Sequence, residues 1–304
     1  MFELFGKTQI DFVGRRYIFF ALSGVLVSLG LLALVQISRG AANLGIDFAG
    51  GAAVQLKFSQ PVRINDARKL LDENGIKDAE LQEFTEGDKL LIRMKNQEIT
   101  GRLSDRLMAI FTKAFPGNSP VVESSTEIGP TIGEKLRQNA MVAVAISVVA
   151  IIIYIAMRFE LRFGIAATAA TFHDVLAVLG MFYLMNKEIN LLVVTALLTL
   201  AGYSLTDTVV VFDRIRENLR TRRKERLEEI INAGINQVLS RTAVVSLTVF
   251  LVLVALFFWG GEVIHDFALA LILGIIVGTY SSWFVASPLL LLFKKSQGRL
   301  LKRA

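Results

Sequence analysis

Residues 202–218 read GYSLTDTVVVFDRIREN, and the first half of this stretch continues an apolar run that begins at Leu191. The carboxylate of Asp207 interrupts the run. A helix that crosses a hydrocarbon core of about 30 Å needs roughly 20 apolar residues. Six runs approach or exceed that length, at Tyr17–Ile37, Asn139–Met157, Phe163–Leu184, Leu191–Phe212, Val238–Trp259 and Asp266–Phe293. The sequence therefore predicts an α-helical polytopic membrane protein with six transmembrane helices.

The composition agrees with this class, since 53% of the 304 residues are hydrophobic and the mean hydropathy is +0.54. Only residues 38–138 are polar for long enough to fold outside the bilayer. The expected order there is strand 52–58, helix 62–75, strands 79–86 and 89–96, helix 98–115 and strand 121–129. This βαββαβ order predicts one external ferredoxin-like α+β domain. Its acids and bases are scattered over helix faces, which favours binding or mechanical coupling over chemistry.

Basic residues set the expected orientation. They cluster before the first run, between the second and third, between the fourth and fifth, and after the sixth, whereas the opposite short loops hold only Lys187. The positive-inside rule then places both termini in the cytoplasm and residues 38–138 outside. The expected division is 1–37 for the N-terminus and first helix, 38–138 for the external (periplasmic) domain, 139–293 for helices two to six, and 294–304 for a basic cytoplasmic tail.

Several chemistries are disfavoured by what the chain contains. It has no cysteine and two histidines, so thiol catalysis is excluded and little material remains for a metal site. No G-x-x-x-x-G-K-[ST] loop occurs, so we expect no nucleotide site. The net charge of +6 reflects topology and contact with anionic lipid head groups, not nucleic acid. No cofactor and no metal are expected.

Asp207 is the first candidate site residue, because a charge within the bilayer costs a few kcal/mol or more and usually serves ions, protons or substrate. Its natural partner is Arg241, near the start of the fifth run. Asp213, six residues later, needs only an interfacial interpretation. A static polar contact between helices is the alternative for Asp207, and an arginine that snorkels to the interface is the alternative for Arg241.

His173 and Asp174 form a second candidate site, about 18 Å into the third run when counted from Arg162. A histidine and a carboxylate near mid-membrane are candidates for proton handling. A buried hydrogen-bonded pair that only packs helices together is the alternative. Gly274 and Gly278 form a G-x-x-x-G in the sixth run, a weak motif that favours close helix packing.

The stretch GIDFAGG at 45–51 directly follows the first run. Gly50 and Gly51 give the backbone freedom between membrane exit and the first strand, and Asp47 is expected to bond local amides. We interpret Gly45, Asp47, Gly50 and Gly51 as hinge or structural residues, with a plain turn as the alternative.

Four stretches together resemble the SecD/SecF family of protein-export membrane proteins, in the resistance-nodulation-division superfamily. They are GIDFAGG (45–51), TFHDVL (171–176), GYSLTDTVVVFDRIREN (202–218) and LSRT (239–242). The resemblance covers essentially the whole chain. Family members usually read N-D-T where this sequence has Thr206-Asp207-Thr208, so the asparagine is missing but the acid is present.

The resemblance implies a non-enzymatic accessory subunit of the bacterial Sec translocase, located in the cytoplasmic (inner) membrane and paired with SecD. Its other implied partners are the SecYEG channel, SecA indirectly, the exported unfolded polypeptide and membrane lipids. In this family the acid matching Asp207 and the arginine matching Arg241 belong to the proton-conducting site. The external domains help to draw the exported chain outward, driven by the proton motive force.

Two other functions compete with this interpretation. A stand-alone proton-coupled exporter of small molecules or lipids would also need buried acids and an external domain. However, six spans and one domain of about 100 residues are half of what such pumps hold in one chain. A passive assembly protein would not require Asp207 to titrate.

Overall fold

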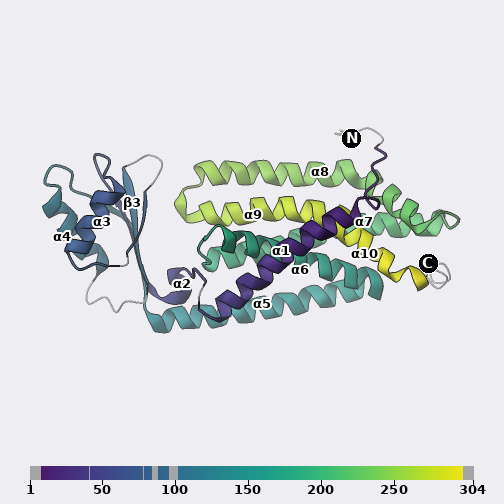
Figure 1. Cartoon of the computed structure of the whole chain (residues 1–304), viewed down its shortest axis with the longest axis horizontal. Helices are drawn as coiled ribbons and strands as arrows, with labels where there is room; N and C mark the ends of the chain where they lie inside the picture. The colour runs from purple at the N-terminus through teal and green to yellow at the C-terminus, as the bar shows by residue number, and fades with distance from the viewer. Residues whose placement is uncertain (1–7, 41, 78, 84–87, 96–101, 297–304) are drawn as a thin grey trace. The chain divides into compact units, whose positions relative to one another are not determined.

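The computed structural model describes residues 8–40, 42–77, 79–83, 88–95 and 102–296 (Figure 1). The chain divides into two compact units, one of residues 1–43 and 143–304 and the other of residues 44–142. Among the described residues, six helical stretches are long and apolar enough to cross a membrane. They are α1 (Arg16–Ser38), α5 (Pro130–Arg158), α6 (Leu161–Leu184), α7 (Leu191–Thr221), α8 (Leu227–Trp259) and the stretch Val263–Phe293.

The sixth stretch is built from several helical pieces. It begins as α9 (Glu262–Ser281) and passes into a π-helical turn, η1 (Ser282–Ala286). A short α10 (Ser287–Leu289) and a 3₁₀ helix, η2 (Leu290–Ser296), follow. The hydroxyl of Ser287 donates to the carbonyl oxygen of Ser282 at 2.8 Å, five residues back. The helix therefore changes its winding at Ser282, and such π-turns often lie at functional sites.

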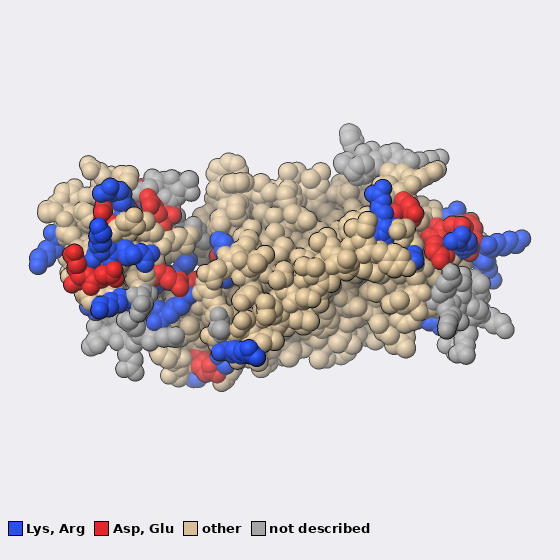
Figure 2. Space-filling view, in the orientation of Figure 1, with Lys and Arg blue, Asp and Glu red and all other residues tan. Residues whose placement is uncertain are grey.

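The helices are longer than the apolar runs that predict them. Helix α5 begins nine residues before Asn139, α7 continues from Phe212 to Thr221, and α8 begins eleven residues before Val238. Hydropathy detects only the part of a helix that suits lipid, whereas hydrogen bonding continues into the polar ends. Figure 2 shows charged side chains on the small unit and around the α7–α8 connection, with a nearly uncharged band over the helices.

The small unit is a four-stranded sheet with two helices. Its elements are β1 (Gly51–Lys57), α3 (Ile64–Glu73), β2 (Glu80–Glu83), β3 (Lys89–Lys95), α4 (Leu103–Ala114) and β4 (Val121–Ile128). The sheet order is β2-β3-β1-β4 and all neighbours are antiparallel, which is the arrangement of a βαββαβ ferredoxin-like fold. A short helix, α2 (Ile46–Ala49), precedes β1. The end of the strand predicted at 79–86 and the start of the helix predicted at 98–115 lie outside the described residues.

Alternation along β1 and β3 creates the core of this unit. Ala52, Val54 and Leu56 are buried on one face of β1, and Leu71 of α3 and Phe111 of α4 belong to the same cluster. The period of two along a strand places these alternate side chains beneath the helices. The fold class predicted from the sequence is thus confirmed in both its parts.

In the helical unit, α6, α7 and α9 contact one another, α8 packs on α7 and α9, and α1 lies along α6 (Figure 1). Two glycines permit the last contact. A Cβ atom on Gly30 would lie 2.2 Å from the carbonyl oxygen of Leu176, and one on Gly180 would lie 2.6 Å from the nitrogen of Gly30. Helix α1 therefore approaches α6 backbone to backbone, as small residues allow in membranes.

The N-terminal segment before α1 is held against α8 by side-chain amides. Asn232 Oδ1 accepts hydrogen bonds from the backbone nitrogens of Phe12 and Val13, both at 3.0 Å. Asn236 bonds both the nitrogen and the oxygen of Ile10. Phe12 is buried and packs on the rings of Trp283 and Phe284 in η1. The segment thus covers the π-helical turn.

Candidate functional site

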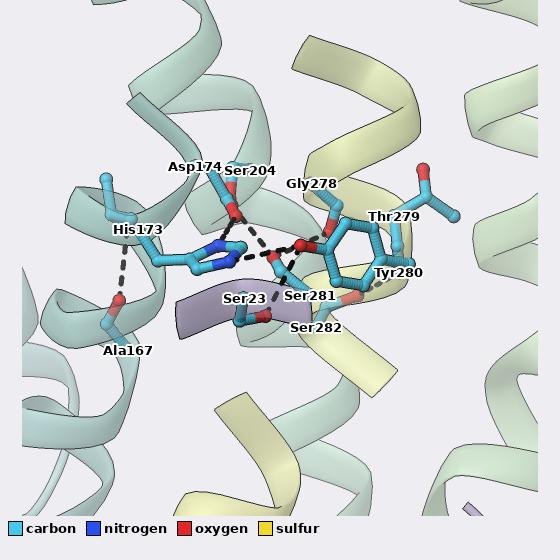
Figure 3. A network of polar contacts seen from close by, with 11 residues as sticks. Ser23, Ala167, His173, Asp174, Ser204, Gly278, Thr279, Tyr280, Ser281 and Ser282 are labelled. Atoms are coloured by element: carbon cyan, nitrogen blue, oxygen red, sulfur yellow. Dashed lines mark hydrogen bonds and ion pairs between the residues drawn. The ribbon is translucent and has the colours of Figure 1, made fainter. Parts of the chain in front are cut away.

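Asp174 is the centre of a polar cluster inside the helical unit. The residue is fully buried on α6, and its Oδ1 lies 2.7 Å from Nδ1 of the neighbouring His173. Its Oδ2 accepts hydrogen bonds from the hydroxyls of Ser204 on α7 and Ser281 on α9, the latter at 2.9 Å. Figure 3 shows these groups converging on the carboxylate. Three helices therefore meet at one acid.

Asp207 lies in the same region of the bundle. Its Oδ2 accepts a hydrogen bond of 2.6 Å from the hydroxyl of Ser282, and only 8% of the residue is exposed. Ser281 and Ser282 are consecutive, so the junction of α9 with the π-helical turn presents one hydroxyl to each carboxylate. The structure thereby brings the two predicted sites, one on α6 and one on α7, to a common pair of serines.

Small residues make this convergence possible. Gly278 faces the cluster, because a Cβ atom there would lie 3.3 Å from Cβ of Ser204 and 3.7 Å from Oδ2 of Asp174. One turn earlier, a Cβ atom on Gly274 would lie 2.6 Å from a methyl carbon of Leu200. The G-x-x-x-G pair therefore lies at the contact of α9 with α7.

Arg241 lies apart from Asp207 in this arrangement. The arginine is exposed on α8, and neither residue has an ion pair among the described residues. The contact of α8 with this region is made instead by Ser246, which receives hydrogen bonds from Tyr203 at 3.2 Å and Thr279 at 2.8 Å. Asp213 pairs with Arg158 at the end of α5, in keeping with an interfacial position.

Hydroxyl residues of the sixth stretch are the part of the site that sequence reasoning missed. Besides the two serines, the hydroxyl of Tyr280 lies 3.1 Å from Nε2 of His173 and 3.3 Å from the hydroxyl of Ser23 on α1. The signal was the run T-Y-S-S at 279–282 inside an otherwise apolar helix. Within the described part of the chain, no group of three or more histidine and carboxylate residues forms a potential metal site.

The GIDFAGG stretch lies in the small unit, where two of its glycines have φ angles that favour glycine. Gly50 has φ +73° and Gly51 has φ +140°. A Cβ atom on Gly51 would lie 2.1 Å from the carbonyl oxygen of Met94 in the paired strand β3. Gly45 precedes the first turn of α2, and Asp47 lies within that turn. Both chain geometry and close strand pairing therefore require Gly51.

The arrangement defines a class of protein: a polytopic membrane protein whose bundle encloses ionisable groups, joined to a ferredoxin-like unit outside the spans. Family models match in the same two regions. Residues 108–296 match the model for the C-terminal part of the protein export membrane proteins SecD and SecF, and residues 42–62 match the SecD/SecF GG motif. The chain belongs to the SecD/SecF family.

Individual relatives agree with this assignment. The chain is 54% identical to a protein named protein translocase subunit SecF from Thermodesulfovibrio yellowstonii, over 100% of both chains. It is 43% identical to a protein of the same name from Calditerrivibrio nitroreducens, over 96% of both. The crystal structure of SecDF, a translocon-associated membrane protein from Thermus thermophilus, superposes with a TM-score of 0.83 at 37% identity.

SecDF is a longer chain than this one. The superposition covers 95% of the present chain but only 39% of that SecDF chain. A second structure, of SecDF in a super-membrane-facing form, gives a TM-score of 0.70 at 36% identity, with coverage of 100% and 41%. The present chain therefore corresponds to about two fifths of SecDF.

Proposed function

We propose that this protein is an accessory subunit of the bacterial Sec translocase, which pairs with SecD and uses the proton motive force to promote protein export. The observation that carries the proposal is the pair of buried carboxylates, Asp174 and Asp207, bridged by Ser281 and Ser282. Full-length similarity to proteins named translocase subunit SecF supports it. Those relatives do not favour a stand-alone exporter.

The partner assignment rests on similarity. The matched structures are of SecDF, and the present chain corresponds to 39% of the first of them, so SecD is the partner that we propose. SecYEG, SecA acting indirectly, the exported unfolded polypeptide and membrane lipids complete the set of partners. The exposed apolar surface of α5, which includes Met141 and Ile146, suits burial against lipid or SecD.

The proposed orientation rests on the charge pattern. Basic residues gather at the start of α1, at Arg15 and Arg16, and in the run 214–226, which spans the end of α7 and its connection to α8. We place both termini and this connection in the cytoplasm, and the small unit outside the cytoplasmic membrane. The small unit then faces the emerging polypeptide, with Gly50 and Gly51 as the junction that transmits motion to it.

Asp207 is the group that gains and loses the proton. In the structure the hydroxyl of Ser282 donates to its carboxyl, and Arg241 forms no ion pair with it. In the alternate arrangement α7 and α8 shift so that ionised Asp207 lies beside that arginine. One elementary charge crossing 100 mV releases about 2.3 kcal/mol. One unit of pH difference adds about 1.4 kcal/mol.

Asp174 and His173 form the part of the proton-conducting site that stays in place. Asp174 is held by three donors, whereas the structure gives Asp207 one. One further feature supports movement near Asp207. The hydroxyl of Thr208 is buried without a hydrogen-bond partner among the described residues, which costs about 1–3 kcal/mol. A second arrangement that satisfies this hydroxyl recovers that free energy.

The test replaces Asp207 by asparagine, which keeps the shape and hydrogen bonding of the side chain but cannot titrate. Export into inverted membrane vesicles is measured with ATP and SecA held constant, in energised and in uncoupled membranes. Wild type is expected to gain from the gradient, whereas Asp207→Asn assembles with SecD and gains nothing.

Asp213→Asn is the matched control, because it removes a carboxylate from the same helix at a partly exposed ion pair. This variant is expected to keep the gradient-dependent gain. An Asp207→Asn complex with the full gain would refute the assignment of Asp207 to the relay.

A further inference from the structure

A continuous hydrogen-bonded chain runs from α1 to Asp174. Ser23 of α1 contacts the hydroxyl of Tyr280, Tyr280 contacts Nε2 of His173, and Nδ1 of His173 contacts Asp174, at 3.3, 3.1 and 2.7 Å. His173 and Asp174 are 5% and 0% exposed. Figure 3 shows the tyrosine hydroxyl between the imidazole ring and Ser23. The chain therefore joins the buried acid to a helix outside the α6–α7–α9 core.

The chemistry of the groups fixes the direction of each bond when His173 is neutral. An ionised carboxylate only accepts hydrogen bonds, so Nδ1 of His173 carries the proton and donates to Asp174. Nε2 is then bare and accepts from the hydroxyl of Tyr280. Because the tyrosine proton is used in that bond, Ser23 must donate to the tyrosine oxygen. Every donor in the chain points from α1 toward Asp174.

Protonation of His173 reverses part of this chain. Both ring nitrogens of an imidazolium are donors, so Nε2 now donates to the oxygen of Tyr280. The tyrosine hydroxyl turns to donate to Ser23, whose oxygen becomes an acceptor. No atom has to move far, yet the hydrogen bond that reaches α1 changes its direction with the charge on the histidine.

Ser23 is well placed to transmit this change. Among the described residues of α1, it is the one whose side chain forms a hydrogen bond with another transmembrane helix. Helix α1 also approaches α6 closely at Gly30 and Gly180. Helix α1 ends at Ser38 and the chain then continues into the small unit.

We propose that Tyr280 is a positioning residue that couples the protonation of His173 to α1 through Ser23. The proposal rests on the proton-coupled function above and deepens it by adding a route from the site to the small unit. Other ionisable groups lie around the histidine on its packed neighbours: Asp174 of α6 bonds Nδ1, Tyr280 of α9 contacts Nε2, and Asp207 of α7 bonds the nearby Ser282. Helix α1 contributes Ser23, which is uncharged, so α1 responds to the charge on His173 without changing it.

The test compares four variants in the complex with the partner subunit. Tyr280→Phe removes both bonds of the tyrosine, and Ser23→Ala removes only the bond to α1. Ser23→Thr restores a hydroxyl at the same position. Ser28→Ala is the matched control, because the hydroxyl of Ser28 bonds the carbonyl oxygen of Gly24 within α1 and does not belong to the chain from Ser23 to Asp174.

The first measurement is the gradient-dependent gain in export, with assembly checked by copurification. Tyr280→Phe and Ser23→Ala are expected to reduce the gain roughly two- to tenfold, the range that one hydrogen bond contributes. Export driven by SecA and ATP in uncoupled membranes stays unchanged. Ser23→Thr and Ser28→Ala keep the gain.

The second measurement is the ¹⁵N NMR signal of His173. It reports whether Tyr280 bonds Nε2, so it distinguishes the loss of that bond from a change in packing alone. The chain has two histidines, so His265→Gln leaves one signal pair in histidine-labelled protein. Tyr280→Phe is expected to shift the Nε2 signal toward that of an unbonded nitrogen. Ser23→Ala is expected to leave it in place.

The outcomes separate the two proposals. Full gain in Ser23→Ala, or an unshifted Nε2 signal in Tyr280→Phe, overturns the coupling through Tyr280 while Asp207→Asn still loses the gain. Equal losses in Ser23→Thr and Ser23→Ala overturn it as well, because packing would then matter and not the hydroxyl. If Tyr280→Phe fails to assemble, the two Ser23 variants decide. Full gain in Asp207→Asn removes the proposed function itself.

Discussion

Asn232→Ala is expected to release the N-terminal segment from α8. The substitution removes three hydrogen bonds: two accepted from the nitrogens of Phe12 and Val13 at 3.0 Å, and one donated to Asp11 at 2.8 Å. At about 0.5–1.5 kcal/mol each, their sum is about 3 kcal/mol. Phe12 and Val13 are both 2% exposed, and their burial contributes about 4 kcal/mol together.

The opposing term is the backbone entropy of the segment. Ordering residues 10–13 costs about 6 kcal/mol at roughly 1.5 kcal/mol per residue. Docking is thus favoured by about 1 kcal/mol with Asn232 and disfavoured by about 2 kcal/mol with alanine. The released population is therefore expected to rise from roughly a sixth to nearly all of the molecules, since about 1.4 kcal/mol changes an equilibrium tenfold.

The chain lacks cysteine, so Val13→Cys provides a single thiol for maleimide labelling in membrane vesicles. The labelling rate reports how often this buried position opens. Asn232→Ala is expected to raise the rate about sixfold over the Val13→Cys parent. Asn236→Ala is the control, because its bonds to Ile10 are exposed and their loss has a smaller effect. Equal labelling rates in the parent and in Asn232→Ala would refute the role of Asn232 in holding the N-terminal segment against α8.

Further expectations concern two glycines and one carboxylate. Gly51→Ala, at φ +140°, is expected to destabilise the small unit by about 2 kcal/mol or more, seen as faster limited proteolysis of residues 44–142. Gly180→Ala should overpack α1 against α6, destabilise the protein by about 1–3 kcal/mol and lower its thermal unfolding temperature. Gly24→Ala is the control and should not lower that temperature, because a Cβ atom at Gly24 would have no neighbour within 4 Å. The backbone N–H of Gly14 lowers the pKa of Asp11 from 3.8, so its contribution is present above that value and lost as pH falls through the folded pKa. The labelling rate of Val13→Cys, divided by that of an exposed cysteine at the same pH because the thiolate is the reacting form, should therefore stay flat from about pH 8 to 5.

Structural features that depend on which residues face water, lipid or the core were predicted well from the sequence. The six spans follow from the length of the apolar runs, and the ferredoxin-like unit follows from alternation and helical periodicity in residues 52–129. Helix ends were predicted less well, because α7 and α8 continue as polar helices beyond the bilayer, from Phe212 to Thr221 and from Val238 back to Leu227. Hydropathy carries no information about that continuation.

The site was predicted only in its charged members. Asp207, Asp174 and His173 stand out because ionisable groups are costly in an apolar run. Ser281 and Ser282 do not, because a serine in a helix can satisfy its hydroxyl by bonding a carbonyl of its own preceding turn, as both also do here. Whether such a hydroxyl also meets a neighbouring acid depends on helix rotation and on the π-helical turn, which sequence periodicity does not report.

The structure also changes how the junction at Gly50 and Gly51 must be tested. If the two glycines form a hinge, replacing both by valine should impair export by stiffening it. However, Gly51 pairs with β3 at a distance that leaves no room for a Cβ atom, so valine would also damage the sheet. Impaired export by that double variant supports a hinge only if proteolysis shows the small unit intact. Gly50→Ala is the milder change, because the nearest atom to its Cβ position is 3.1 Å away.

The way the two acids are held assigns them different parts in a cycle. Breaking a buried ion pair costs about 3–5 kcal/mol, whereas one hydrogen bond contributes about 0.5–1.5 kcal/mol. Asp207 is held by one hydroxyl and no ion pair, so it can leave Ser282 at a cost below the free energy of one proton moving down the gradient. Asp174 is held by three donors from three helices and would lose all of them by moving. Asp207 is therefore the mobile acid, and Asp174 is the fixed acid that joins α6 to α7 and α9 while α7 and α8 shift relative to each other.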